Sequence, residues 1–127
     1  MTSSGATKHF TKGQTIMNAE FLARGIMENF PEASAGSSLE CRGWHYDDWV
    51  YTFVDEEEAK TYTLDKPTLL AAVPLMFSEE WLPGLTPVPA NLLDGDEETI
   101  GDWLCQADAT DFDAFIQLAI FGEVIYG

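Results

Sequence analysis

The side chains of this chain that could do chemistry are mostly carboxylates. Of the 127 residues, 22 are Asp or Glu and only six are Lys or Arg, which gives a net charge of −16 at pH 7. Many of the acids come in short runs, which makes them candidates for binding a partner. The candidate partner-binding residues are Asp55, Glu56, Glu57, Glu58, Asp94, Asp96, Glu97, Glu98, Asp102, Asp108, Asp111 and Asp113.

The two halves of the chain differ in their balance of charge. All six basic residues lie in the first 66 positions, whereas residues 67–127 hold eleven acids and no Lys or Arg. An ordinary protein surface mixes both signs, so this half lacks ion-pair partners of its own and repels itself. It would also repel a phosphate backbone or an anionic membrane. We therefore expect a cationic partner, with no direct contact to nucleic acid or membrane.

An array of carboxylates on a rigid frame can imitate the phosphates of a nucleic acid. DNA carries one negative charge per about 1.7 Å of duplex, so a mimic needs many acids on a compact fold. The alternative is that these acids form solvated faces and helix starts, where the helix macrodipole favours negative charge. That alternative does not explain why Lys and Arg are missing from residues 67–127.

Metal binding is less well supported by the sequence. Residues 94–98 begin like a calcium-binding EF-hand loop, but the central glycine and the closing glutamate are missing. Cys41 and His45 are unusually spaced for zinc and would need two further ligands. We therefore expect no metal and no cofactor, and we expect Cys41 and Cys105 to be two buried thiols.

Catalytic motifs are also missing from the sequence. There is no phosphate-binding loop, no nucleophile elbow and no metalloprotease helix motif. His45 is the one serious candidate for a catalytic base, because His9 lies near the N-terminus. We expect a protein that is not an enzyme. A hydrolase that uses a pair of carboxylates remains an alternative, since such pairs are plentiful here.

The pattern of apolar residues predicts one helix followed by strands in the first half of the chain. Residues 15–30 carry an apolar stripe at helical spacing, with Thr15 as N-cap and Pro31 as the end. Strand-like runs follow at residues 39–46, 48–54 and 59–64, and the acidic turn 55–58 joins the last two. The aromatic residues of these runs are expected to pack in the core and on the sheet rather than to stack on bases, since acids surround them.

Helices are predicted for the second half. Residues 65–80 form a helix with Asp65 as its N-cap, which Pro74 should kink or split, and a second helix covers residues 96–106. A last helix covers residues 111–125, capped by Asp108 or Thr110. The expected fold is α+β: an N-terminal helix, a three-stranded antiparallel meander, then about three helices packed on one face of the sheet.

The domain organisation follows from composition. Residues 1–13 are rich in Ser, Thr and Gly and are predicted to be a flexible arm, and residues 14–127 are predicted to be a single α+β domain. No apolar stretch approaches the roughly 20 residues that a membrane span needs, and the N-terminus lacks the apolar segment of a secretory signal. We expect a cytoplasmic location.

The C-terminal segment carries a resemblance. Residues 111–127 (DFDAFIQLAIFGEVIYG), and the final FGEVIYG in particular, resemble the C-terminal end of small proteins of phages and mobile elements. In size, acidity and lack of catalytic motifs the chain is also similar to anti-CRISPR proteins and other DNA-mimic inhibitors. These resemblances imply a phage-type inhibitor that binds the basic surface of a nucleic-acid-binding defence complex in the host cytoplasm. The alternative is a non-enzymatic accessory or structural module that acts through apolar contacts or self-association as a homodimer.

Overall fold

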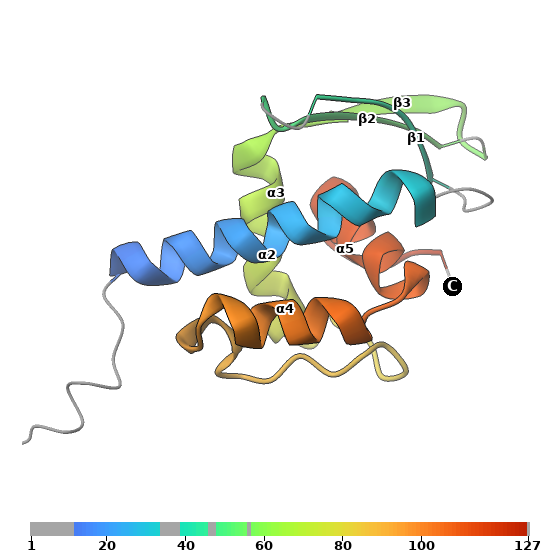
Figure 1. Ribbon diagram of the computed structural model, residues 1–127. Coiled ribbons are helices and arrows are strands. Elements are labelled where there is room, and N and C mark those ends of the chain that lie inside the picture. The colour runs from blue at the N-terminus through green and yellow to red at the C-terminus, as the bar shows by residue number, and fades with distance from the viewer. Residues whose placement is uncertain (1–11, 34–38, 46–47, 56, 127) are drawn as a thin grey trace, which may run out of the picture.

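The computed structural model describes residues 12–33, 39–45, 48–55 and 57–126. Its architecture is α+β, as the sequence predicts, and within the described residues one helix precedes the sheet and the other helices follow it (Figure 1). In chain order the elements are α2 (Lys12–Ala33), β1 (Leu39–His45), β2 (Val50–Asp55), β3 (Lys60–Leu64), α3 (Lys66–Ala72), the 3-10 helices η1 (Val73–Phe77) and η2 (Leu92–Asp94), α4 (Glu97–Gln106) and α5 (Ala109–Phe121).

The strands pair in the order β1-β2-β3, and both pairings are antiparallel. Side chains alternate along β2, as they must in a pleated strand. Tyr51, Phe53 and Asp55 are fully buried on the face toward the helices, whereas Val50, Thr52 and Val54 on the other face are half-buried. The sheet thus contributes one face to the core.

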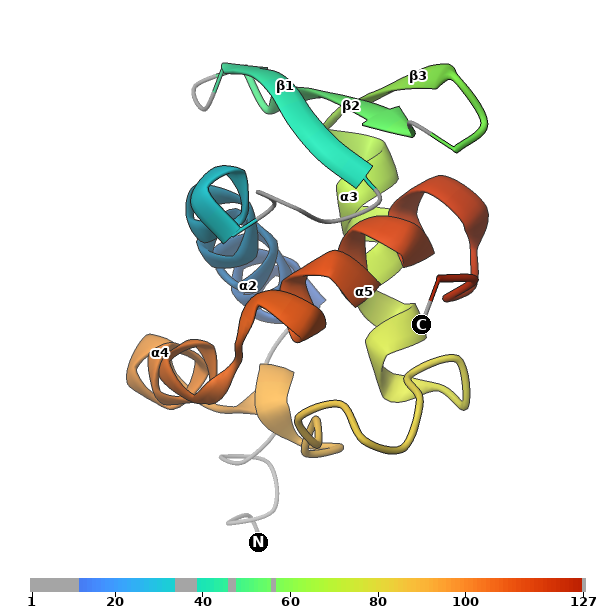
Figure 2. The same ribbon diagram turned by 90° about the vertical axis from the view of Figure 1, so that its right-hand side faces the viewer.

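The helices form layers beneath the sheet (Figure 2). α2, α3 and α5 lie next to the sheet, and α4 lies on the far side of the molecule, packed against α2. This differs from the expectation that the helices following the sheet all pack on one of its faces. The sheet is too small to bury the apolar stripes of every helix, so Ile100 and Trp103 of α4 are buried within the helical layers instead.

Two helix boundaries differ from the prediction. α2 begins at Lys12 and runs past Pro31 to Ala33, because the fixed φ of proline is compatible with a helical turn even though its N–H is missing. Lys12 and Gly13, predicted to belong to the flexible arm, are therefore helical, and residues 1–11 lie outside the described part. α5 ends at Phe121 rather than at residue 125, because Gly122 adopts a left-handed conformation with φ of 77°.

Two other local predictions are confirmed. Asp65 caps α3 by accepting a hydrogen bond from the Thr68 N–H over 3.0 Å. Pro74 lies in the first turn of η1, so the helix predicted for residues 65–80 is split where α3 gives way to the 3-10 helix. Within the described residues, no helix is long and apolar enough to cross a membrane.

Candidate functional site

Six exposed carboxylates gather on α4 and the segments that flank it. They belong to η2, to the N-cap and first turns of α4, and to the N-cap of α5, which follows the end of α4. We call this group the acidic α4 surface; its members are Asp94, Asp96, Glu97, Glu98, Asp102 and Asp108, all of which are exposed.

The start of α4 is fixed by its own residues. Asp96 caps the helix by accepting hydrogen bonds of 2.9 Å from both the backbone N–H and the hydroxyl of Thr99. The bond from the backbone N–H, reinforced by the hydroxyl, holds the pKa of Asp96 below its ordinary value, so this carboxylate stays ionised well into the acid range. Glu97 and Glu98 follow in the first turn, where the macrodipole favours acids.

α2 packs against the buried side of α4 and fixes the position of this surface. The side-chain amide of Asn18, which is buried, donates to the carbonyl oxygens of Leu93 and Gly95 over 2.7 and 3.0 Å, just before α4 begins. Further along, Gly25 faces Leu104 so closely that a Cβ atom at position 25 would clash with the Leu104 side chain. α4 therefore packs closely against α2 at Gly25, because this residue has no side chain to keep Leu104 away.

The basic side chains that the structure describes are Arg24, Lys60 and Lys66, and they lie on α2, on β3 and at the start of α3. The Arg24 guanidinium lies 5.2 Å from the ring centre of Trp49, and the Lys66 ammonium lies 5.4 Å from it. Lys66 also pairs with Glu20 over 3.0 Å, and Lys60 is in β3. None of the six carboxylates of the acidic α4 surface forms an ion pair with a basic side chain in the described part of the chain. Their charge is uncompensated locally.

Two of the predicted partner-binding acids are buried in the fold. Asp111 accepts hydrogen bonds from the Thr86 N–H and hydroxyl and from the Asp108 N–H, at 2.6–2.9 Å. Asp55 is fully buried and accepts from the Tyr126 hydroxyl over 2.7 Å. We correct the prediction for both, because a carboxylate enclosed by intramolecular donors cannot contact a partner.

The remaining predicted acids lie elsewhere. Asp113 is half-buried and bonded to Gln117 over 2.7 Å, and burial raises the pKa of its carboxyl group. Glu57 and Glu58 are exposed in the β2–β3 turn, on the sheet side of the molecule and opposite α4 (Figures 1 and 2). Glu56 lies outside the described residues. The twelve candidates therefore do not form one surface.

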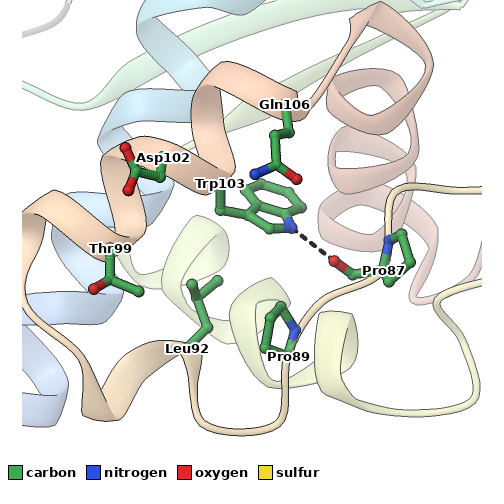
Figure 3. Close-up of a pocket in the computed structure, with 7 residues that line it drawn as sticks. All are labelled: Pro87, Pro89, Leu92, Thr99, Asp102, Trp103 and Gln106. Carbon is green, nitrogen blue, oxygen red and sulfur yellow. Dashed lines mark hydrogen bonds between the residues drawn. The ribbon is translucent and has the colours of Figure 1, made fainter.

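An open groove of about 370 Å³ lies beside the acidic α4 surface. α4 forms one wall, and the irregular segment before η2 forms the other (Figure 3). The indole N–H of Trp103 donates to the carbonyl oxygen of Pro87 over 2.9 Å and so ties the two walls together. The lining residues are Pro87, Pro89, Leu92, Thr99, Asp102, Trp103 and Gln106.

Comparison with protein-family models, curated proteins and solved structures found no match.

The structure places both thiols, whereas the side chain of His45 lies outside the described part. Cys41 is buried and its pKa is raised by burial, but Cys105 is exposed, which corrects the prediction of two buried thiols. The reason is that α4 buries the side that carries Ile100 and Trp103, and Cys105 lies outside that side. Among the described residues, no group of three His, Cys, Asp or Glu side chains is arranged to hold a metal ion.

Sequence reasoning missed the residues that position the site. Asn18 was assigned no role, although a polar residue on the apolar stripe of α2 indicates a buried hydrogen bond. Gly25 in the middle of a predicted helix is a signal of close packing. The bond between Trp103 and Pro87 joins residues 16 apart through an irregular segment, and no sequence pattern indicates it.

Proposed function

We propose that this protein is an inhibitor that acts by binding, and that the acidic α4 surface occupies a Lys- and Arg-rich nucleic-acid site on a partner protein. The observation that carries the proposal is the set of six exposed, unpaired carboxylates within residues 94–108, a region without a single basic residue. The resemblance to phage-borne inhibitors suggests that the partner belongs to a host defence complex that binds nucleic acid.

The spacing of these acids supports mimicry of a phosphate backbone. The ten residues of α4 span about 15 Å at a rise of about 1.5 Å per residue. Asp96 stands at one end of this length and Asp108 follows the other end, with Glu97, Glu98 and Asp102 between them. The twelve residue steps from Asp96 to Asp108 cover at least about 18 Å at this rise, so the five charges are separated on average by roughly 4.5 Å, somewhat wider than the spacing of about 3.4 Å along one DNA strand.

The rigidity of the surface supports the proposal as well. A mimic binds well when its charges are held in place before contact, because ordering them on binding would cost conformational entropy. The N-cap at Asp96, the two hydrogen bonds from Asn18 and the packing of Leu104 against Gly25 fix the backbone of α4. The backbone that carries the acidic α4 surface is thus held in its final conformation before the partner binds.

The experiment that tests this proposal compares two pairs of charge removals. The protein is used as bait in a nuclease-treated host lysate, and the captured proteins are identified at low and high salt. Glu97→Gln/Glu98→Gln should abolish the capture of a nucleic-acid-binding protein, and so should high salt, because exposed charges are screened. Glu79→Gln/Glu123→Gln removes two exposed charges elsewhere and should leave capture intact. Equal loss from both variants, or capture that resists salt, would refute the proposal.

One observation favours the second candidate, an accessory module that associates through apolar contacts. Ile16, Met17 and Phe21 in the first half of α2 are 49%, 62% and 37% exposed, and Met17 and Phe21, four positions apart, lie on the same side of the helix. Self-association through this patch predicts a dimer in sedimentation analysis that persists in high salt. Met17→Glu should then give a monomer, whereas Leu82→Glu, at a 43% exposed leucine in another part of the fold, should not.

A further inference from the structure

We propose that the groove beside Trp103 binds an arginine side chain of the partner protein. This inference rests on the proposed function and names one specific contact within it. The groove adjoins the acidic α4 surface and shares Asp102 with it, so a cationic side chain drawn to that surface meets the groove.

The walls of the groove suit the aliphatic stem of arginine. Pro87 and Pro89 on one side and Leu92 at the base present apolar surface (Figure 3). The indole of Trp103 is 4% exposed, and its N–H is already bonded to the Pro87 carbonyl oxygen, so it offers the groove carbon atoms rather than a donor. Long basic side chains bury their methylene groups on surfaces of this kind and keep their charge in water.

The rim supplies acceptors that suit a guanidinium. Thr99, Asp102 and Gln106 follow one another at spacings of three and four on α4, so they share one side of the helix. The Thr99 hydroxyl donates its proton to Asp96, so the lone pairs of the Thr99 oxygen remain free to accept a hydrogen bond. Asp102 and Gln106 make no side-chain hydrogen bond to another described residue. The rim thus holds one carboxylate, one amide and one hydroxyl. The Asp102 carboxylate points away from Trp103 in Figure 3, so this exposed side chain must turn toward the groove to accept from a guanidinium.

Arginine fits these acceptors better than other occupants. A guanidinium presents five N–H donors in a flat fork and stays protonated, whereas an ammonium is a compact, strongly hydrated charge. The apolar walls favour the more weakly hydrated guanidinium. A purely apolar ligand would bury Asp102 without a partner, which is unfavourable, and an anion would be repelled by the neighbouring Glu98 and Asp96.

The test is an NMR titration of the full-length ¹⁵N-labelled protein with hexa-arginine and hexalysine peptides at matched ionic strength. Hexa-arginine should bind about tenfold more tightly than hexalysine, the effect of roughly one additional charge-assisted hydrogen bond at the lower end of the usual range. It should also shift the Trp103 indole and Gln106 side-chain amide signals, which hexalysine should leave nearly unchanged.

Two matched variants locate the effect. Asp102→Asn and Glu98→Gln each remove one exposed charge from α4, one turn apart, and only Asp102 lines the groove. Asp102→Asn should abolish the preference for hexa-arginine over hexalysine. Glu98→Gln should lower the affinity for both peptides by the same factor. Equal binding of the two peptides by the wild-type protein, or equal effects of the two variants, would refute the arginine site in the groove. Neither result would refute the proposed function. Failure of both peptides to bind at low salt would overturn both.

Discussion

The hydroxyl of Tyr126 donates a hydrogen bond of 2.7 Å to the buried carboxylate of Asp55, 71 residues earlier in the chain. The ring of Tyr126 packs edge-on against Phe121, and Phe121 packs in the same way against Tyr62 of β3. Gln117 accepts hydrogen bonds of 2.8 Å from the N–H groups of Ile125 and Tyr126. The C-terminal segment is thereby fastened to both α5 and the sheet, which gives the FGEVIYG sequence a structural role.

Tyr126→Phe should destabilise the protein, because the buried carboxylate of Asp55 loses a hydrogen-bond donor. Among the described residues, the backbone N–H groups of Glu57 and Glu58 would remain as its donors. Chemical denaturation should show a lower midpoint with an unchanged slope. Tyr62→Phe is the control, since it removes a hydroxyl from the same group of rings and keeps the contact with Phe121. Equal losses from the two variants would contradict the role of the hydrogen bond.

The same hydrogen bond predicts a pH dependence. Donation to the Asp55 carboxylate, together with burial and the nearby Glu57 and Glu58, raises the pKa of Tyr126 above the ordinary 10.0. Because the folded pKa is above the unfolded one, the stabilisation is complete below about pH 10 and is lost as the pH rises further. Absorbance titration of tyrosinate should show a late-titrating component that is missing from Tyr126→Phe. A late component of the same amplitude in Tyr126→Phe would refute this.

Asp111→Ala should lower the free energy of unfolding by about 2–3 kcal/mol, because the N–H groups of Thr86 and Asp108 lose a charged acceptor. The residue is buried, so its removal should leave the affinity for a cationic peptide unchanged while the variant is folded. Urea denaturation and peptide binding measured on one sample separate the two effects. Weakened peptide binding by folded Asp111→Ala would mean that Asp111 does face a partner.

Two helical glycines should respond differently to alanine. Gly101 in α4 has open space where a Cβ atom would lie, so Gly101→Ala should stabilise the fold by roughly 1 kcal/mol through helix propensity. Gly25→Ala gains the same propensity, but Leu104 must move, so the stabilisation should be smaller or reversed. Combining Gly25→Ala with Leu104→Ala should recover the propensity gain relative to Leu104→Ala alone. Equal gains at positions 25 and 101 in thermal denaturation would show that α4 does not pack closely on α2.

Local features of the fold could be predicted from the sequence, and features that join distant segments could not. The caps at Asp65, Asp96 and Asp108 and the split at Pro74 depend on residues within a few positions, which a pattern records. The burial of Asp111 depends on Thr86, 25 residues away, so the sequence gives no means of separating it from the exposed acids.

Part of the candidate site could also be predicted from the sequence, and part could not. The exposed acids of residues 94–108 follow from composition and from the helix start at Asp96. The groove does not, because it forms where an irregular segment with three prolines passes α4, and irregular backbone has no period to detect. Likewise, the separation of Glu57 and Glu58 from α4 depends on how the sheet and helices stack.

The most direct test of the central claim is a competition between this protein and duplex DNA for the purified partner. If the acidic α4 surface occupies the nucleic-acid site, increasing DNA should displace the protein completely, and the protein should lower the apparent affinity for DNA without forming a ternary complex. Glu97→Gln/Glu98→Gln should compete far more weakly than Glu79→Gln/Glu123→Gln. A stable ternary complex of partner, DNA and this protein would contradict the claim.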